Sequence, residues 1–228
     1  MKLTKIISGL IVGATLALAP GQARADFFDG CRGPNEAQLD QRITLSESAP
    51  NYTLLPKAFI GVGEEGHGIF AVTPINYTPK SKPNVGAGVG GFLDLGAVKL
   101  LGVVPVVYSA EGEVININPT VYATIMAGNV LFDPRVSYLA SISGDRTQHN
   151  LSFGATIGYK IDDVILGLDV ATGFDPKNPN VEQLEKSLDY QGIIRVDLDK
   201  EHKHWVQAYL GKDAIGIGFR ANFDFRGK

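Results

Sequence analysis

Between residues 149 and 173 the chain alternates apolar with small or polar side chains over two consecutive stretches. The first places an apolar residue at every second position from Leu151 to Tyr159, and the second does so from Val164 to Val170. Residues 160–163 separate the two stretches and suit a short turn. A period of two is the pattern of a β-strand with one apolar face. We therefore predict an antiparallel hairpin, whose arms have the length of about 9–11 residues that a membrane-spanning strand needs.

The second face of this hairpin consists mostly of small residues, such as Gly154, Thr156, Gly158 and Gly167. A soluble sheet would carry long polar side chains on its wet face, and glycine weakens the interior of an ordinary strand. Inside a narrow barrel, by contrast, small inward residues relieve crowding. An uncharged apolar face opposite a small or polar one is typical of transmembrane β-barrels. The pattern therefore favours a membrane barrel over a soluble β fold.

The first 25 residues have the features of a secretory signal peptide. Lys2 and Lys5 precede an apolar run over residues 6–18, and Ala23-Arg24-Ala25 provides a cleavage site. The run is shorter than the roughly 20 residues of a spanning helix, and no later segment is apolar enough for one. Cleavage would leave 18 lysine and arginine residues against 24 acidic ones, a net charge of −6 without a basic run. This composition gives no indication of nucleic-acid binding.

The rest of the chain is expected to form one domain. Residues 26–40 are rich in turn formers and charges, and we interpret them as an extended leader or a loose plug before a barrel over residues 41–225 and a tail over residues 226–228. Cys31 is the only cysteine, so a disulfide within the chain is impossible. Phe28 and Asp29 stand where a lipidation signal would have small apolar residues, which favours an unpaired thiol at Cys31.

Strand patterns recur along this domain. We expect strands over residues 41–46, 52–62, 68–77, 85–95, 97–109, 113–126, 129–143, 149–160, 164–173, 189–198, 203–211 and 213–225. Because bacterial barrels have an even number of strands, we predict a closed antiparallel transmembrane barrel of about 12 strands, with ten as the alternative. Residues 174–188 form the longest polar connection, and their second half suits one or two helical turns.

Two local features need separate interpretation. Gly86, Gly88 and Gly90 resemble a dinucleotide-binding loop, but they alternate within a strand pattern and no helix follows them, so we predict no cofactor site. Pro119 lies on the apolar face of its strand. Because proline removes a donor from the ladder, we expect a bulge or a locally open ladder there.

At the C-terminus, alternate residues from Ile215 to Phe225 are apolar, and the intervening ones are glycine or polar. This strand resembles the terminal strand of bacterial outer-membrane β-barrel proteins. The resemblance implies an outer-membrane location, contact with outer-membrane lipid, and recognition by the barrel-assembly machinery through the strand that ends at Phe225. The sequence differs from that pattern in continuing through Arg226-Gly227-Lys228. No residue signature identifies a subfamily.

The same resemblance implies a topology in which the short turns are periplasmic and the longer loops lie outside. The expected outside connections are residues 78–84, 109–112, 144–148, 174–188 and 211–213. The expected periplasmic ones include the tight turns at residues 95–97 and 160–163. The connection at residues 127–134, which contains Asp133-Pro134, is longer than the rule prefers.

The strand phase predicts a set of charged residues that face the lumen. They are Asp94, Asp169, Arg195, Asp197, Arg220 and Asp224. One interpretation is a constriction that selects solutes by charge, as rings of charged side chains do in pores. The other is a structural network of ion pairs that fills a narrow barrel, because buried charges must be paired. Aromatic residues near strand ends are expected to form girdles at the membrane interfaces: Tyr108, Tyr138, Tyr159, Tyr190, Trp205, Phe223 and Phe225.

No arrangement of residues points to catalysis or to a metal. His149 and Ser152 lie on opposite faces of one strand, so they cannot act together as base and nucleophile. His202 and His204 share a face at a predicted turn, without a convincing third ligand nearby.

The sequence thus predicts an outer-membrane β-barrel that is either a narrow pore for small hydrophilic solutes or a structural protein of the Gram-negative envelope. The alternative is a soluble periplasmic barrel or sandwich that binds an apolar ligand. A third hypothesis is an outer-membrane lipid-modifying enzyme.

Overall fold

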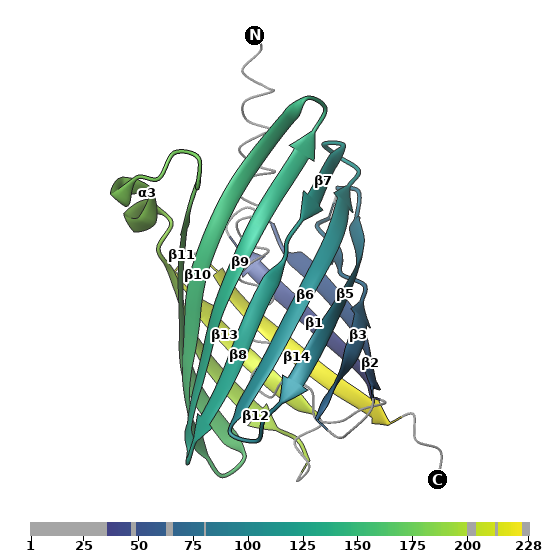
Figure 1. Ribbon diagram of the computed structural model, residues 1–228. Coiled ribbons are helices and arrows are strands. Elements are labelled where there is room, and N and C mark those ends of the chain that lie inside the picture. The colour runs from purple at the N-terminus through teal and green to yellow at the C-terminus, as the bar shows by residue number, and fades with distance from the viewer. Residues whose placement is uncertain are drawn as a thin grey trace.

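A computed structural model describes residues 36–46, 49–62, 66–79, 81–199, 204–212 and 214–224. The predicted signal peptide, residues 26–35 of the predicted leader, Cys31, Phe225 and the tail lie outside the described residues. The described part of the chain winds into a single barrel of strands, and one short helix lies beside its wall (Figure 1).

The described residues form fourteen strands and the helix α3 (Val181–Lys186). The strands are β1 (Glu36–Ser46), β2 (Asn51–Gly61), β3 (His67–Val72), β4 (Ile75–Tyr77), β5 (Asn84–Asp94), β6 (Val98–Ser109), β7 (Val114–Ile117), β8 (Thr120–Ala127), β9 (Val130–Ser143), β10 (Arg146–Ile161), β11 (Val164–Phe174), β12 (Asp189–Asp197), β13 (Trp205–Gly211) and β14 (Ala214–Asp224).

All of these strands pair antiparallel in one sheet, and the sheet closes on itself. The first strand, β1, pairs with β2 on one side and with β14 on the other. The short strands β3 and β4 both lie between β2 and β5, and β7 and β8 both lie between β6 and β9. Each of these two pairs therefore forms a single spanning strand. The predicted closed antiparallel barrel of 12 strands is confirmed.

Proline causes both interruptions. Val72 lies opposite Lys57 and Ile75 opposite Leu54, so the register is unchanged across Pro74. The register on β6 is likewise unchanged across Pro119, since Ile117 lies opposite Val106 and Thr120 opposite Val103. The ladder at Pro119 is therefore locally open without the extra residue of a bulge. The interruption at Pro74 was not predicted.

Several predicted boundaries differ from the structure. The turn between β8 and β9 is only Gly128 and Asn129, and Asp133-Pro134 lies within β9. The sequence interpretation instead placed a break at Asp133-Pro134, within a connection over residues 127–134. The structure leaves the β8–β9 pairing open opposite Pro134. β1 begins at Glu36 rather than residue 41, and β10 begins at Arg146 rather than residue 149.

Exposure alternates along the strands in the predicted phase. On β10, Ile157 and Tyr159 are exposed, whereas Thr156 and Gly158 are buried. On β11, Leu168 is 51% exposed and the adjacent Asp169 is 0% exposed. The exposed apolar side chains around the wall, represented by Ile157, Leu168 and Ile217, are called the apolar belt below. Among the described residues, no helix has both the length and the apolar character to cross a membrane.

The interior also holds an apolar cluster that the sequence interpretation did not predict. Its members come from the wall between β2 and β8: Phe59, Phe70, Val72, Phe92, Leu101, Val103 and Tyr122. Glycine makes room for these rings, because a methyl group added at Gly90 would lie 2.5 Å from the ring of Phe70. One added at Gly68 would lie 2.7 Å from the ring of Phe92. Inward glycines thus let aromatic rings lie against the backbone of the neighbouring strand.

Candidate functional site: the charged lumen

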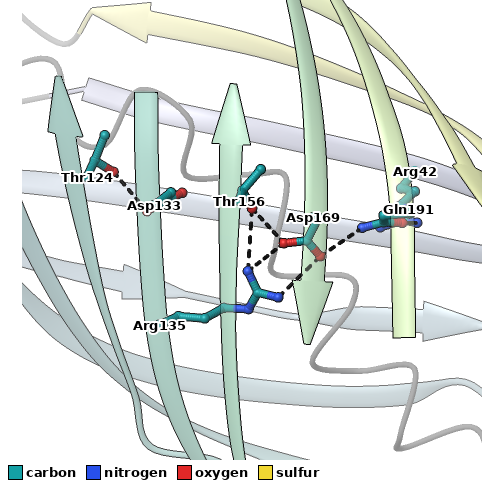
Figure 2. A network of polar contacts seen from close by, with 7 residues as sticks. All are labelled: Arg42, Thr124, Asp133, Arg135, Thr156, Asp169 and Gln191. Carbon is teal, nitrogen blue, oxygen red and sulfur yellow. Dashed lines mark hydrogen bonds and ion pairs between the residues drawn. The ribbon is translucent and has the colours of Figure 1, made fainter. Parts of the chain in front are cut away.

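Asp169, on β11, is the centre of a polar network inside the barrel (Figure 2). Arg135 on β9 binds its carboxylate with both terminal nitrogens, at Nη1–Oδ1 2.7 Å and Nη2–Oδ2 3.2 Å. Thr156 on β10 donates to Oδ1 at 2.6 Å, and Gln191 on β12 donates to Oδ2 at 3.4 Å. The carboxylate is fully buried, and donors from three other strands satisfy it.

Strand register explains this arrangement. Asp169 lies directly opposite Thr156 on one side and Gln191 on the other. Arg135 lies opposite Gly154 and reaches past it, because a methyl group at Gly154 would stand 2.3 Å from Arg135 Nη2. Gly154 therefore provides the space through which the guanidinium contacts Asp169.

Further polar contacts lie on both sides of this network. Arg42 Nη2 on β1 donates to Gln191 Oε1 at 3.3 Å, and its guanidinium lies 3.8 Å from the ring centre of Tyr209. On β9, Asp133 accepts a hydrogen bond from Thr124 at 3.1 Å (Figure 2). Polar contacts thus link the lumen faces of strands that are far apart in the sequence.

A second group of charges bridges the seam where the first strand meets the last. Asp40 on β1 lies opposite Arg220 on β14, and Arg220 Nη2 donates to Asp40 Oδ2 at 2.9 Å. Lys57 Nζ on β2 also donates to Oδ2 of Asp40. All three residues are buried, and we call Asp40, Lys57 and Arg220 the seam triad.

A third group lies beside the seam triad, on β12 and β13. Arg195 Nε donates to Asp197 Oδ1 at 2.8 Å, and both side chains are buried. The ring of Trp205 is contacted by two guanidinium groups, those of Arg195 at 5.1 Å and Arg220 at 4.9 Å. Trp205 therefore faces the lumen, and its predicted place in an outer aromatic girdle was wrong.

Trp205 belongs to the lumen because it lies opposite Arg220, so it has the phase of the inward residues. A position near a strand end does not by itself give a side chain's face. Four of the other predicted girdle residues are exposed on the outer wall: Tyr108, Tyr159, Tyr190 and Phe223.

Four of the six predicted lumen charges lie in these buried groups, namely Asp169, Arg195, Asp197 and Arg220. Asp94 lies elsewhere, beside the turn after β5, where it pairs with Lys99 at 3.1 Å. Asp224 lies opposite Glu36 in the β1–β14 ladder, and its side chain is outside the described part of the structure.

Sequence reasoning missed five buried charges: Glu36, Asp40, Lys57, Asp133 and Arg135. Asp40 fell in the segment interpreted as a leader, and Lys57 fell in a strand that was not phased. Asp133 and Arg135 share one face of β9 with Leu131, opposite Phe132 and Val136. Continuing the alternation through Pro134 would have placed both of them inward.

The buried charges are close to balanced. Among the residues whose side chains the structure describes, five acids are buried (Glu36, Asp40, Asp133, Asp169 and Asp197), as are four bases (Lys57, Arg135, Arg195 and Arg220), with Arg42 partly buried beside them. Removing one partner of a buried ion pair costs about 3–5 kcal/mol, because the other charge remains in a poorly solvated site. This interior can therefore stabilise the barrel, and it can also set the charge preference of a narrow passage.

The histidines considered in the sequence are placed apart from this lumen. His149 stacks on Tyr138 at 5.8 Å between ring centres, on the face opposite to Ser152. His204 Nδ1 lies 2.7 Å from Asp199, while His202 is outside the described residues. Within the described ranges, no three histidine, cysteine or acidic side chains gather closely enough to hold a metal ion.

A closed antiparallel barrel with an apolar outer wall and a polar interior is the architecture of outer-membrane β-barrels. Among solved structures, the NanC porin matches with a TM-score of 0.55 at 13% identity, covering 79% of this chain and 98% of NanC. The KdgM porin in complex with disordered oligogalacturonate matches with a TM-score of 0.54 at 10% identity, covering 83% of this chain and 99% of KdgM. No protein-family model matches the sequence, and a comparison with curated proteins found no match. At these identities the likeness is one of fold.

Proposed function

We propose that this chain is an outer-membrane β-barrel protein that forms a narrow pore for small hydrophilic solutes. The proposal rests on the orientation of the side chains, because apolar ones face out of the barrel wall and charged ones face in. Leu168 is exposed on the outer wall, while its neighbour Asp169 is ion-paired inside. A soluble barrel that binds an apolar ligand would have the opposite arrangement, with its valine, leucine and isoleucine face turned inward. Exposed Ile157 and Ile217 contradict that alternative.

The surfaces of the barrel indicate which partners the protein would contact. The apolar belt would contact outer-membrane lipid, and the barrel-assembly machinery would recognise the last strand through Phe225. The tight turns, which include Gly128–Asn129 and Asp162–Asp163, would face the periplasm. The proposed activity is passage rather than catalysis, since His149 and Ser152 lie on opposite faces and give a lipid-modifying enzyme no paired base and nucleophile.

A structural role in the envelope is the second candidate, and the pairing of the buried charges favours it. Arg135 with Asp169, Arg195 with Asp197, and the seam triad hold the interior together as a salt-bridge network would. A barrel filled by such pairs would be stable and conduct poorly.

Planar-bilayer recordings on the purified protein separate the two candidates. We expect small, discrete current steps with weak ion selectivity, because the acids and bases of the lumen nearly balance. Asp169→Asn should shift the reversal potential towards anion preference, since it removes a negative charge and leaves Arg135 in place. Asp145→Asn, a change in an exposed turn outside the lumen, should leave the reversal potential unchanged. Absence of current from correctly folded protein would reject the pore and leave the structural role.

A further inference from the structure

The connection between β11 and β12, residues 175–188, folds back on the outer wall of the barrel. In Figure 1 its helix α3 lies outside the barrel beside β11. Thr172, near the end of β11, has the same phase as Leu168 and Val170 and therefore points outward. The helix packs against this outward end of the strand rather than over the mouth of the barrel.

Hydrogen bonds fix the helix in this place. Thr172 Oγ1 donates to the carbonyl oxygen of Leu184 at 2.7 Å. The Ser187 hydroxyl donates to the carbonyl oxygen of Gly173 at 2.6 Å and lies 3.0 Å from its backbone nitrogen, which donates to it. At the start of the loop, the backbone N–H of Asp175 donates to Gln183 Oε1 at 3.2 Å. Through Leu184 and Ser187 these contacts tie the end of the helix to β11, and Gln183 ties its middle to the start of the loop.

Despite these contacts, α3 leaves apolar side chains uncovered. Val181 is 70% exposed, and Leu188, just after the helix, is also exposed. Tyr190 on β12, two residues after Leu188, is also exposed, and it lies opposite Val170 of the apolar belt. Leu184 is half-buried, and the remaining side chains of the helix are polar or charged, including Glu182 and Lys186, which pair at 2.6 Å. The loop therefore exposes apolar side chains at Val181 and at Leu188, which adjoins the belt through Tyr190, together with charged side chains that suit water.

We propose that α3 is an interfacial helix, seated in the boundary between headgroups and acyl chains of the leaflet at this end of the barrel. The inference rests on the proposed membrane function, whose topology makes that leaflet the outer one. Short amphipathic segments lie in this boundary with their apolar side chains buried about 5–10 Å into it. The occupant of the exposed surface of Val181 and Leu188 is therefore lipid, and this loop lies along the wall rather than over the mouth of the barrel.

Depth-dependent quenching tests this placement. In a Cys31→Ser background, a fluorescent label is attached in turn to Val181→Cys, Leu188→Cys, Leu168→Cys and Asp145→Cys, and each folded variant is placed in phosphatidylcholine vesicles. The vesicle lipids carry bromine either high or deep on the acyl chain. Because interfacial insertion is shallow, the labels at residues 181 and 188 should be quenched about twofold more by the shallow bromine than by the deep one.

The two control positions separate failure of the inference from failure of the proposed function. The label at residue 168 should be quenched most by deep bromine, and the label at residue 145 by neither lipid. If residue 168 is quenched while residues 181 and 188 behave like residue 145, the helix is in water and the inference is wrong. If residue 168 is also unquenched, the membrane barrel itself is wrong, and the interfacial helix with it.

Discussion

Replacing Asp40 by asparagine is expected to lower the free energy of unfolding by about 3–5 kcal/mol, the cost of leaving buried charges without their counter-charge. The effect should be large because Lys57 and Arg220 both pair with this carboxylate at the seam between β1 and β14. Neutralisation leaves both cations buried without it. Urea unfolding in detergent micelles measures the loss, with fluorescence of Trp205, the only tryptophan in the chain, as the signal.

Two further variants show whether the loss comes from the charge. Asp145→Asn makes the same chemical change in an exposed turn, where the expected effect is within about 0.5 kcal/mol. The triple variant Asp40→Leu, Lys57→Met, Arg220→Leu removes the whole seam triad. The triple variant should regain most of the unfolding free energy that Asp40→Asn loses, because replacing a complete buried ion group by apolar residues is often close to neutral. If Asp40→Asn is as harmless as Asp145→Asn, the seam triad does not hold the barrel closed.

Replacing Leu168 by lysine is expected to destabilise the barrel by about 2–4 kcal/mol in lipid vesicles, the cost of a cation near the middle of a bilayer. Leu168 is in the middle of β11 and belongs to the apolar belt. A lysine there would place its charge in hydrocarbon, so both stability and membrane assembly should suffer. Equilibrium unfolding from vesicles measures the first, and heat-modifiable migration in gels measures the second.

Ile161→Lys is the matched control for this change. Ile161 is 50% exposed, close to the 51% of Leu168, but it is the last residue of β10, beside the turn. Near a membrane interface the cost of lysine falls to about 0–1 kcal/mol. If the wall lies in a membrane, lysine should cost clearly more stability at residue 168 than at residue 161, although the two positions are equally exposed. If water surrounds the wall, the two costs should be equal. Equal tolerance of both lysines would count against the membrane-spanning belt.

Much of the fold could be predicted because its signals are local. Alternation with a period of two gave the face of Leu168 and Asp169, and turn residues separated the strands. The even number of strands in bacterial barrels, together with the pattern of the last strand, predicted a closed barrel of 12 strands. Boundaries were less accurate where proline occurs, because Pro134 sits inside a strand whose ladder opens only locally.

The interior was less predictable because it depends on register between distant strands. Arg135 contacts Asp169 only because three strands align and Gly154 lies between them. Along the chain these two charges are unrelated. The apolar cluster was missed for a different reason: β6 is apolar on both faces, so its pattern does not distinguish Leu101 and Val103, which are buried, from Val104 and Val106, which are exposed. The outward placement of α3 likewise depends on hydrogen bonds to Thr172 and Gly173.

The most direct test of the orientation uses two adjacent pairs of identical residues. Ile193 is buried and Ile194 exposed on β12, and Leu101 is buried and Leu100 exposed on β6. A nitroxide label is placed at each position in turn, in the Cys31→Ser background, and its collision rates with lipid-dissolved oxygen and with a water-soluble nickel complex are measured in vesicles. Labels at residues 194 and 100 should collide often with oxygen and rarely with nickel, whereas labels at residues 193 and 101 should be shielded from lipid. Frequent oxygen collisions at residues 193 and 101, together with nickel access at residues 194 and 100, would contradict this orientation of the barrel wall.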